Sequence, residues 1–468
     1  MSNSNPNARK NKPTSESLRN ILKREGLKVH FVGIGGVSMY SLAILTVKMG
    51  HNVSGSDIFR GERSYDLVLR GVSVFTEHSA ECVKDRDLVV YSHAVTKENP
   101  ELVEAERLGV PTFSRAEYLG ELMLGYKKKI GVSGTHGKST TVAMLERIFT
   151  SAGVNPTVLS GAKLESGSPI REGDTGTLIY EACEYKDSFL SFSPSVAVAL
   201  NLEFDHPDYF SDIYSLQSSF TKALSRASGF AVINIDDENL EKILPQIKKR
   251  ARVVTFGQSD TADYSYFVSS FEDGYLGFTL YHFKKEIETF RLSVPGVHNV
   301  SNAVAAIVVA LEHGISIDII KEAIAGFSGI ERRLEYIGER GSKKIYYDYA
   351  HHPTEIAATI NTIRLMSQGP ITVVFKPHTY SRTAELWESF CSSLSLADRV
   401  IVTDIYPARE NSIEGVNSKR LAEDIGSFAE YSPDSEVAVR LDLQHGKGVV
   451  VLMGAGDLDD VKYDVLNK

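Results

Sequence analysis

The sequence predicts an α/β protein of three domains whose sheets are mainly parallel. Short apolar runs, each followed by a glycine-containing turn and a helical pattern, recur along the chain in three series. This alternation is typical of parallel sheets with crossover helices. The length of 468 residues suits three domains, since one domain takes about 100–200 residues. An apolar fraction of 42% with 24% charged residues allows each domain to bury a core.

The first series spans residues 27–126 and predicts an N-terminal Rossmann-like domain. Strands are expected at 28–32, 51–54 and 87–91, with a helix that ends near residue 49. Residues 1–26 are rich in Asn, Ser and basic side chains and have no apolar core. We therefore expect a flexible tail there, and neither a signal peptide nor a membrane anchor.

The second series spans residues 127–335 and predicts a central domain with a mainly parallel sheet. Strands are expected at 130–132, 177–182, 195–202 and 229–235, and helices at 138–152 and 299–311. Between residues 264 and 294 the apolar pattern changes to a period of two, with Asp273-Gly274 as a hairpin turn signal. This pattern predicts an antiparallel flap on the sheet.

The third series spans residues 336–468 and predicts a second, C-terminal Rossmann-like domain. Its strands are expected at 344–347, 371–375, 399–403 and 449–453, with helical stretches between them.

Charge and cysteine content limit the functional classes. The net charge of −9 is spread along the chain, which argues against nucleic-acid binding because that needs a basic surface. Three cysteines without a C-x-x-C pair are typical of reduced thiols in a cytosolic protein. No apolar stretch approaches the about 18 residues of a membrane span. We expect a cytoplasmic protein with no membrane partner.

The strongest local motif lies between an expected strand and an expected helix. It runs from Gly134 to Thr140 as Gly134-Thr135-His136-Gly137-Lys138-Ser139-Thr140. Glycines there let backbone N–H groups face phosphate oxygens at a helix N-terminus. Lys138 would reach the β- and γ-phosphates and Ser139 would ligate magnesium. The alternative for an isolated G-K-S is a glycine-rich turn with a solvated lysine, but the strand–loop–helix context favours a P-loop ATPase-like domain.

A second glycine motif predicts a diphosphate site in the N-terminal domain. It consists of Gly33-x-Gly35-Gly36-x-Ser38, followed by Asp57 after the second expected strand. The third glycine of a dinucleotide fingerprint is replaced by Ser38. The physical requirement is a diphosphate at a helix N-terminus, which UDP meets as well as NAD does.

Polar side chains follow two buried strands of the central domain. Glu184 and His206 are both expected at the carboxyl edge of the sheet, where parallel α/β folds bind ligands. The carboxylate suits magnesium as a hard oxygen donor, whereas histidine is a less usual ligand for that ion. Taken singly, each residue can also be a strand-end charge or a cap.

These motifs together resemble the Mur ligase family, over nearly all of residues 28–457. The nucleotide loop resembles the family's G-T-x-G-K-[ST]-T. The other family-like segments follow in the family's order, at Glu181-Ala-Cys-Glu184, Asn201-Leu-Glu-Phe-Asp205-His206, Gly296-Val-His298-Asn299-Val-Ser-Asn302-Ala303, Gly329-Ile-Glu-Arg332-Arg333 and Asp348-Tyr-Ala-His351-His352-Pro353.

The resemblance implies an ATP- and Mg²⁺-dependent ligase with the three-domain family architecture. It implies that Glu184 and His206 hold metal with Ser139, and that the ATP site includes the nucleotide loop, His298, Asn299, Asn302 and Arg332. It also implies that the N-terminal domain binds the UDP end of a UDP-sugar, near Gly35, Gly36, Ser38 and Asp57.

Segments of the last domain look like the alanine-adding branch of the family. They are Lys376-Pro-His-Thr-Tyr-Ser-Arg382-Thr, Asp404-Ile-Tyr-Pro-Ala-Arg-Glu410 and Met453-Gly-Ala-Gly-Asp457. The resemblance implies the substrates UDP-N-acetylmuramate and L-alanine, joined through an acyl phosphate. Thr379 stands where many members have arginine, so Arg382 is expected to orient the alanine carboxylate. His351 is a candidate for accepting the amine proton or for contacting the oxyanion.

Two departures and two alternatives accompany this expectation. Cys183 and Lys186 stand where many members are acidic, and each is expected to alter the surroundings of the metal without removing a ligand. One alternative is a ligase for a preformed murein tripeptide. The other is a nucleotide-regulated binding protein without turnover. We expect a monomer or a weak homodimer.

Overall fold

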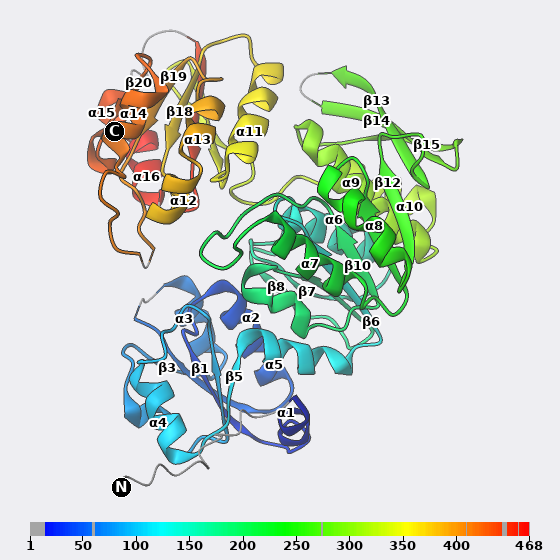
Figure 1. Cartoon of the computed structure of the whole chain (residues 1–468), viewed down its shortest axis with the longest axis vertical. Coiled ribbons are helices and arrows are strands. Elements are labelled where there is room, and N and C mark those ends of the chain that lie inside the picture. The colour runs from blue at the N-terminus through cyan, green and yellow to red at the C-terminus, as the bar shows by residue number, and fades with distance from the viewer. Residues whose placement is uncertain are drawn as a thin grey trace, which may run out of the picture.

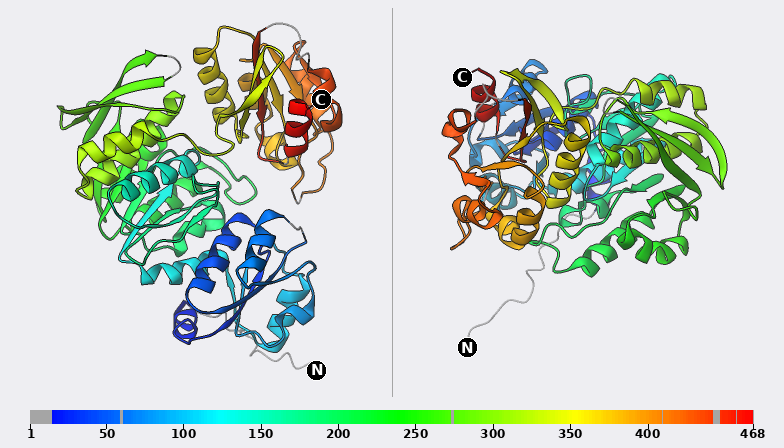
Figure 2. Two further views of the ribbon diagram at one scale, coloured as in Figure 1. Left: turned by 180° about the vertical axis from the view of Figure 1, so that it is seen from behind. Right: turned by 90° about the horizontal axis from the view of Figure 1, so that it is seen from above.

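The computed structural model describes residues 15–58, 61–272, 275–408, 410–441, 447–456 and 458–467. These residues form three lobes, each with its own sheet (Figure 1). We call them the N-terminal lobe (β1–β5 with their helices), the central lobe (β6–β15) and the C-terminal lobe (β16–β21). The N-terminal and C-terminal lobes both lie against the central lobe, as the views from behind and above also show (Figure 2). The predicted three-domain α/β architecture is confirmed.

The N-terminal lobe has a five-stranded parallel sheet in the order β3-β2-β1-β4-β5. Its strands are β1 (Lys28–Val32), β2 (Asn52–Ser56), β3 (Ser73–Phe75), β4 (Leu88–Tyr91) and β5 (Thr112–Ser114). Its helices are α2 (Val37–Lys48), α3 (Glu62–Leu69), η1 (Ala80–Val83), α4 (Pro100–Leu108), α5 (Arg115–Leu122) and η2 (Met123–Gly125). The strand order reverses between β1 and β4, which is where a ligand crevice is expected in such sheets.

The predicted flexible tail at residues 1–26 is wrong for part of its length. Residues Ser15–Ile21 form helix α1, and residues 1–14 lie outside the described part of the chain. Leu18 is fully buried and Arg19 pairs with Glu121 of α5 at 3.1 Å. Ile21 at the end of the helix packs against the same apolar cluster, so two apolar side chains dock this short helix, and composition alone did not reveal this.

The central lobe contains a ten-stranded sheet in the order β15-β14-β13-β12-β11-β10-β6-β9-β7-β8. Its strands are β6 (Lys128–Ser133), β7 (Thr157–Leu159), β8 (Ile170–Arg171), β9 (Thr177–Glu181), β10 (Val196–Ala199), β11 (Phe230–Asn234), β12 (Arg252–Gly257), β13 (Tyr264–Glu272), β14 (Tyr275–His282) and β15 (Lys285–Arg291). Its helices are α6 (Lys138–Ser151), η3 (Tyr185–Ser191), α7 (Ile213–Leu224), α8 (Glu238–Lys248), α9 (Val297–Glu312) and α10 (Ile317–Ala325).

Two central elements follow directly from their sequence patterns. Strands β13, β14 and β15 pair antiparallel and extend the sheet from β12, so the predicted antiparallel flap is confirmed. The Asp273-Gly274 turn itself lies outside the described residues. Helix α9 is apolar almost all round and is buried along most of its length, as expected for a helix inside a core.

The C-terminal lobe has a six-stranded sheet in the order β16-β17-β21-β18-β19-β20. Its strands are β16 (Glu335–Arg340), β17 (Lys343–Asp348), β18 (Ile371–Phe375), β19 (Arg399–Val402), β20 (Ala429–Tyr431) and β21 (Gly448–Met453). Its helices are α11 (Pro353–Met366), α12 (Tyr380–Glu385), α13 (Trp387–Leu394), α14 (Ser418–Ile425), η4 (Asp434–Glu436), α15 (Val437–Arg440) and α16 (Asp459–Asn467). Strand β16 pairs antiparallel with β17 and begins one residue before the expected domain boundary at 335/336.

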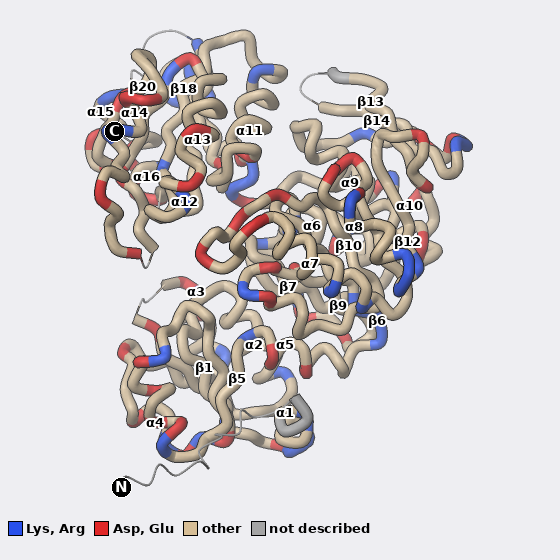
Figure 3. The backbone as a smooth tube through the Cα atoms, viewed as in Figure 1, with Lys and Arg blue, Asp and Glu red and all other residues tan. Residues whose placement is uncertain are grey.

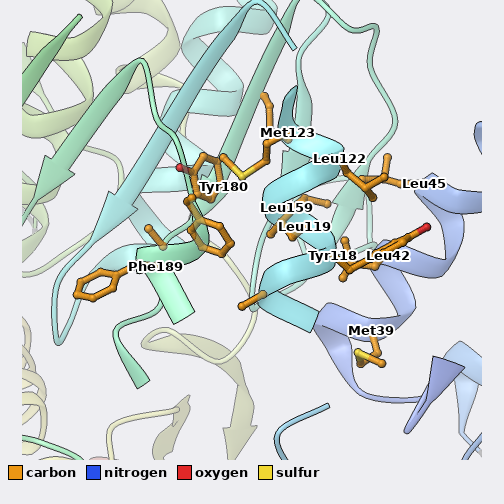
Figure 4. Close-up of a cluster of buried hydrophobic side chains, with 14 of the residues drawn as sticks. Met39, Leu42, Leu45, Tyr118, Leu119, Leu122, Met123, Leu159, Tyr180 and Phe189 are labelled. Carbon is orange, nitrogen blue, oxygen red and sulfur yellow. The ribbon is translucent and has the colours of Figure 1, made fainter. Parts of the chain in front are cut away.

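Among the described residues, the apolar core of the central lobe continues into the N-terminal lobe and not into the C-terminal lobe. One continuous apolar cluster runs from the N-terminal lobe into the central lobe. Figure 4 shows its middle, where Leu119 and Leu122 of α5 lie between α2 and the central residue Tyr180. The C-terminal lobe has two clusters of its own, above and below its sheet. The N-terminal and central lobes are therefore packed together by apolar contacts.

Candidate active site

The nucleotide motif forms the turn between β6 and α6. Gly134 has φ 147° and Gly137 has φ 83°, backbone conformations that favour glycine. A Cβ atom on Gly137 would also collide with the side-chain oxygen of Asn302. Gly137 directly precedes α6, and no side chain caps that N-terminus. Its free N–H groups and partial positive charge make this loop suitable for phosphate.

Lys138 lies over this loop. Its Nζ donates to the backbone oxygens of Gly134 and Thr135, the latter at 3.1 Å, and lies 3.3 Å from both oxygens of Glu184. Burial alone would lower the pKa of Lys138, but the negative charge of Glu184 outweighs it, so the pKa is raised. Lys138 is therefore a cation held by acceptors that a phosphate chain can replace.

The residues predicted to hold metal lie together at the carboxyl edge of the central sheet. Strands β9 and β10 flank β6 on either side, so Glu184 after β9 and His206 after β10 both lie beside the nucleotide loop. His206 Nε2 is 3.8 Å from a Glu184 oxygen, and Ser139 lines the same cleft. A buried carboxylate and a hydroxyl that line one cleft supply the hard oxygen donors that Mg²⁺ prefers, so the residues fit that ion.

The predicted adenine contacts line a pocket next to the nucleotide loop. His298, Asn299 and Asn302 face a cavity of about 300 Å³ that also reaches His136 and Thr140. The His298 side chain is exposed at this cavity, and the protein atoms around it lower its pKa from the usual value, so its ring is neutral and suited to a neutral base. Asn299 does not cap α9, since Gly296 holds that position.

The two arginines of the G-x-x-R-R motif point to different places. Arg332, predicted at the ATP site, donates to the Gly456 oxygen at 3.0 Å and stacks on Tyr347 and Tyr349 of the C-terminal lobe. It lines a cleft of about 640 Å³ that also contains Lys138 and Ser139, and not the pocket of about 300 Å³ at His298, whereas Arg333 lines both. Arg333 therefore reaches both cavities, and the prediction that Arg332 belongs to the ATP site stays a prediction.

The glycine turn after β1 lies at the switch point of the N-terminal sheet. Gly35 N–H donates to Asp57 at 2.9 Å, and the Gly35 oxygen accepts from Arg63 at 2.7 Å. Asp57 thus braces the turn in this structure. Gly36 is the N-cap of α2 without any side-chain cap, and Ser38 lies in its first turn. Both are placed for an anion at the start of α2.

Sequence reasoning missed three basic residues near this turn. Arg63, Arg70 and Lys163 line a cleft of about 640 Å³ that begins at the start of α2 and continues to Lys138. Arg63 and Arg70 are seven residues apart, so they share one face of a helical stretch. That spacing was the available signal. The acidic and basic residues are otherwise interspersed over all three lobes (Figure 3).

His351 lies on the C-terminal side of the same cleft. Its Nδ1 is 3.0 Å from the Tyr349 carbonyl. Because a carbonyl only accepts, Nδ1 carries the proton and Nε2 of the neutral ring is an acceptor. Burial lowers the pKa of His351 to about 3. This tautomer favours the proton-accepting role over the oxyanion contact, which would need a donor.

Arg382, expected to orient an amino-acid carboxylate, is already paired. Its Nη2 donates to both oxygens of Asp205 at 2.9 and 3.1 Å, and its Nη1 lies 3.1 Å from His378 Nδ1. Burial would raise the pKa of Asp205, but the Arg382 charge outweighs it and the pKa is lowered. Arg382 thus links the C-terminal lobe to the central lobe.

A second polar link between these lobes was also missed. His136 of the nucleotide loop lies 3.1 Å from Glu355 of α11 and 3.6 Å from Glu203. Thr354 donates to Glu203 at 2.6 Å. Burial would lower the pKa of His136, but Glu355 and Glu203 raise it to about 9. His136, Glu203 and His352 also group within 4.8 Å.

The sequence contained local patterns for Glu355, Glu203 and Asp205, but not for their partners. Glu355 is the third residue of α11, whose N-cap is His352, and this spacing is that of a capping box. Glu203 and Asp205 lie within the motif that ends at His206. Their partners lie 151 and 177 residues away along the chain, a distance that no local pattern bridges.

Family models match the chain in three consecutive segments. They are "Mur ligase family, catalytic domain" at residues 28–127, "Mur ligase middle domain" at 132–310 and "Mur ligase, glutamate ligase domain" at 332–456. No helix in the described ranges is long and apolar enough to span a bilayer.

Curated relatives match almost end to end. The UDP-N-acetylmuramate–L-alanine ligase of Caldicellulosiruptor saccharolyticus is 42% identical over 450 residues, which are 94% of this chain and 98% of the relative. The ligase of the same name from Acetivibrio thermocellus is 42% identical over 440 residues, 92% of this chain and 93% of the relative.

Solved structures show the same architecture. The UDP-N-acetylmuramate–alanine ligase of Thermotoga maritima superposes with a TM-score of 0.80 at 29% identity, covering 94% of this chain and 98% of that one. A murein peptide ligase from Psychrobacter arcticus gives a TM-score of 0.70 at 23% identity, with the same coverages. The latter likeness shows a shared fold only.

Proposed function

This chain belongs to the Mur ligase family, and from that premise we propose that it joins L-alanine to UDP-N-acetylmuramate with cleavage of ATP. The alanine-ligase relatives match at 42% identity over 92–94% of the chain. The observation that carries the chemistry is the single cleft of about 640 Å³, to which all three lobes contribute. In it the nucleotide loop, the start of α2 and His351 face one another.

The first step that we propose is phosphorylation of the sugar acid. An oxygen of the lactyl carboxylate attacks the γ-phosphorus of ATP, the bond to the β-phosphate oxygen breaks, and ADP leaves. Lys138 turns from Glu184 and the loop carbonyls to the transferring phosphoryl group, whose charge it neutralises. Mg²⁺, which Ser139, Glu184 and His206 would hold, supplies further neutralisation of phosphate charge when bound.

The second step is formation of the amide. The amine of alanine attacks the acyl carbon, and phosphate departs. Only the unprotonated amine is nucleophilic, so its ammonium form must first lose a proton. His351 Nε2 is the proposed acceptor. The pKa of His351 is about 3 with the protein groups alone around it. The negative charge of bound phosphates would raise that pKa.

The alanine carboxylate needs a cation. We propose that it takes the place of Asp205 on Arg382, an exchange of one carboxylate for another. The bidentate geometry of the guanidinium is retained in this exchange. Asp205 directly precedes His206, which is proposed to hold Mg²⁺ beside the nucleotide loop. Displacement of Asp205 by the amino acid would therefore be felt at the ATP site.

We place this reaction in the cytoplasm. The three cysteines, Cys82, Cys183 and Cys391, are all free thiols, which suits a reducing compartment.

One assay separates this function from its alternatives. Phosphate release is measured with ATP, Mg²⁺ and UDP-N-acetylmuramate, adding either L-alanine or the murein tripeptide. Release with alanine only is expected. Release with tripeptide only would select the tripeptide ligase, and no release with either would select the binding protein. The identity of the relatives favours the alanine ligase over both.

Removing the catalytic cation tests the site. Lys138→Ala should lower turnover at least about 1,000-fold, the upper range for loss of one charge-stabilising donor, while the chain stays folded. Lys222→Ala, an exposed lysine in the last turn of α7, is the matched control and should retain turnover. Near-normal turnover in Lys138→Ala would exclude the phosphate role.

A further inference from the structure

Glu355 lies where the central and C-terminal lobes meet, and its two carboxylate oxygens have different partners. It is the third residue of α11, the helix that begins at Pro353 directly after His351 and His352. Only 12% of its side chain is exposed. A buried carboxylate with partners on two lobes can do more than cap a helix.

One oxygen, Oε2, serves the C-terminal lobe. It accepts from the backbone N–H groups of His351 at 3.1 Å and of His352 at 3.3 Å. It also lies 3.3 Å from Nδ1 of the His351 ring. That nitrogen carries the proton, as its contact with the Tyr349 carbonyl requires. Oε2 therefore favours the tautomer that leaves His351 Nε2 as an acceptor.

The other oxygen, Oε1, reaches the central lobe. It lies 3.1 Å from Nδ1 of His136, which is part of the nucleotide loop, and 3.5 Å from Nη1 of Arg333. His136 is itself held by its backbone, since its N–H donates to Asn201 at 2.8 Å. The Oε1 contact therefore ends on a fixed part of the loop.

We propose that Glu355 is a positioning residue that ties the ATP loop to the proton-accepting histidine. The inference rests on the proposed function, which it deepens. When the lobes meet over ATP, the contact of Oε1 with His136 fixes the carboxylate. Oε2 then holds the His351 ring with Nε2 toward the cleft. The amine step is thus prepared only when the nucleotide loop and the C-terminal lobe are together, which limits hydrolysis of the acyl phosphate by water.

A second capping glutamate provides the comparison. Glu117 is the third residue of α5 and accepts from the Ser114 N–H at 2.8 Å in a capping box of the same kind. It lies in the N-terminal lobe, away from the cleft residues named above. If Glu355 only capped its helix, substitution of either glutamate should have the same consequences.

The test substitutes each glutamate by glutamine. In Glu355→Gln the amide oxygen can still accept from the backbone, so the cap is retained, while the amide nitrogen faces the donors of His136 and Arg333. We expect a melting temperature within the range of Glu117→Gln, a kcat lowered at least about tenfold and an increased KM for ATP. Glu117→Gln should keep wild-type kcat and KM.

The formation of the acyl phosphate can be measured separately, which shows which of the two steps is slowed in Glu355→Gln. Without alanine, positional isotope exchange in ATP reports reversible formation of the acyl phosphate. We expect exchange in Glu355→Gln to be retained when ATP is saturating, while amide formation is slow. Equal loss in both steps, or a kcat like the wild type's, would overturn the inference.

A double variant tests the connection to the loop. If Glu355 acts through His136, adding His136→Gln to Glu355→Gln should slow amide formation by less than His136→Gln does alone. If the two substitutions slow amide formation independently, so that their factors multiply in the double variant, Glu355 does not act through His136. Failure of the proposed function is distinguishable from both outcomes, because the wild-type chain would then release no phosphate with alanine.

Discussion

The central lobe meets its two neighbours through interfaces of opposite character. Toward the N-terminal lobe it continues one apolar cluster, in which Met123 packs beside Tyr180 and Leu122 faces Leu45 of α2 (Figure 4). Toward the C-terminal lobe the contacts described above are polar: Asp205 with Arg382 and His136 with Glu355. The same lobe is therefore packed as a core on one side and held by charges on the other.

The difference bears on how the cleft works. Apolar burial is non-directional and no charged ligand replaces it, so it keeps two lobes in one arrangement. Ion pairs and hydrogen bonds exchange with ligands of like charge. ATP, a sugar acid and an amino acid all bring carboxylate or phosphate to the cleft. We therefore expect the C-terminal lobe to move on ligand binding, while the N-terminal and central lobes stay together.

The largest effect is expected from opening the apolar interface. Tyr180 is fully buried and packs edge-on against Phe192. Tyr180→Ala should lower the free energy of unfolding by about 3–5 kcal/mol, the usual loss for removing a core aromatic ring. Urea unfolding measures it. The control is Tyr214→Ala, because that side chain is 75% exposed. A loss below about 1 kcal/mol in Tyr180→Ala would contradict the description of this interface as a core.

A smaller effect is expected from the buried ion pair of the polar interface. Asp205→Ala leaves Arg382 buried without its carboxylate. Breaking a buried ion pair that water cannot reach usually lowers the free energy of unfolding by about 3–5 kcal/mol. We expect a smaller loss here, because the lobes can separate and let water reach Arg382. Small-angle scattering without substrates should then show a larger radius of gyration. Asp260→Ala breaks an exposed pair with Lys284 and should leave the radius unchanged. An unchanged radius in Asp205→Ala would show that this pair does not hold the lobes.

A pH effect distinguishes the interfaces further. The pKa of His136 is raised from 6.5 to about 9 by Glu355 and Glu203. A raised pKa means that the stabilisation is fully present below pH 6.5 and is lost as pH rises through about 9. The pKa values of Glu203, Glu355 and His352 are all lowered. None of these three groups therefore changes its charge between pH 6.5 and 9.

Scattering across pH 6.5–9 should therefore show the C-terminal lobe loosening, and this dependence should vanish in His136→Gln. Hydrogen exchange of α5, at the apolar interface, should not change over the same range. Loosening that persists in His136→Gln would assign the effect to another group.

The smallest effect is expected from a single interlobe hydrogen bond. Thr354→Val removes the donor to Glu203 and should destabilise the contact by about 1 kcal/mol. Faster hydrogen exchange in the segment around Glu203 is the measurement. Thr279→Val removes an exposed hydroxyl in β14 that contacts Thr289, and it should leave that segment unchanged. Equal hydrogen exchange in Thr354→Val and the wild type would show that this hydrogen bond does not stabilise the interface.

Much of the fold was predictable because its signals are local. The expected strand at 371–375 coincides with β18, and the expected helix at 299–311 lies within α9. Short or partly exposed strands were missed, among them β3 and β20. Three residues give too little periodicity to distinguish a strand from a loop.

The candidate site was predictable where a motif follows its own strand. Lys138 and Glu184 were expected at the carboxyl edge, and the structure brings them within 3.3 Å. Arg332 and Arg382 show the limit. Each belongs to a motif that was recognised, yet the side chain of each is directed by a partner distant in the chain.

The sequence by itself determined the three α/β units and the residues at the ends of their strands, because apolar period and glycine turns act over a few residues. Only the tertiary structure decided which unit packs by a core and which by charges, and what Glu355 and Arg382 contact. Those choices depend on surfaces that meet after each lobe has formed, and their free energy comes from groups that no local sequence pattern connects.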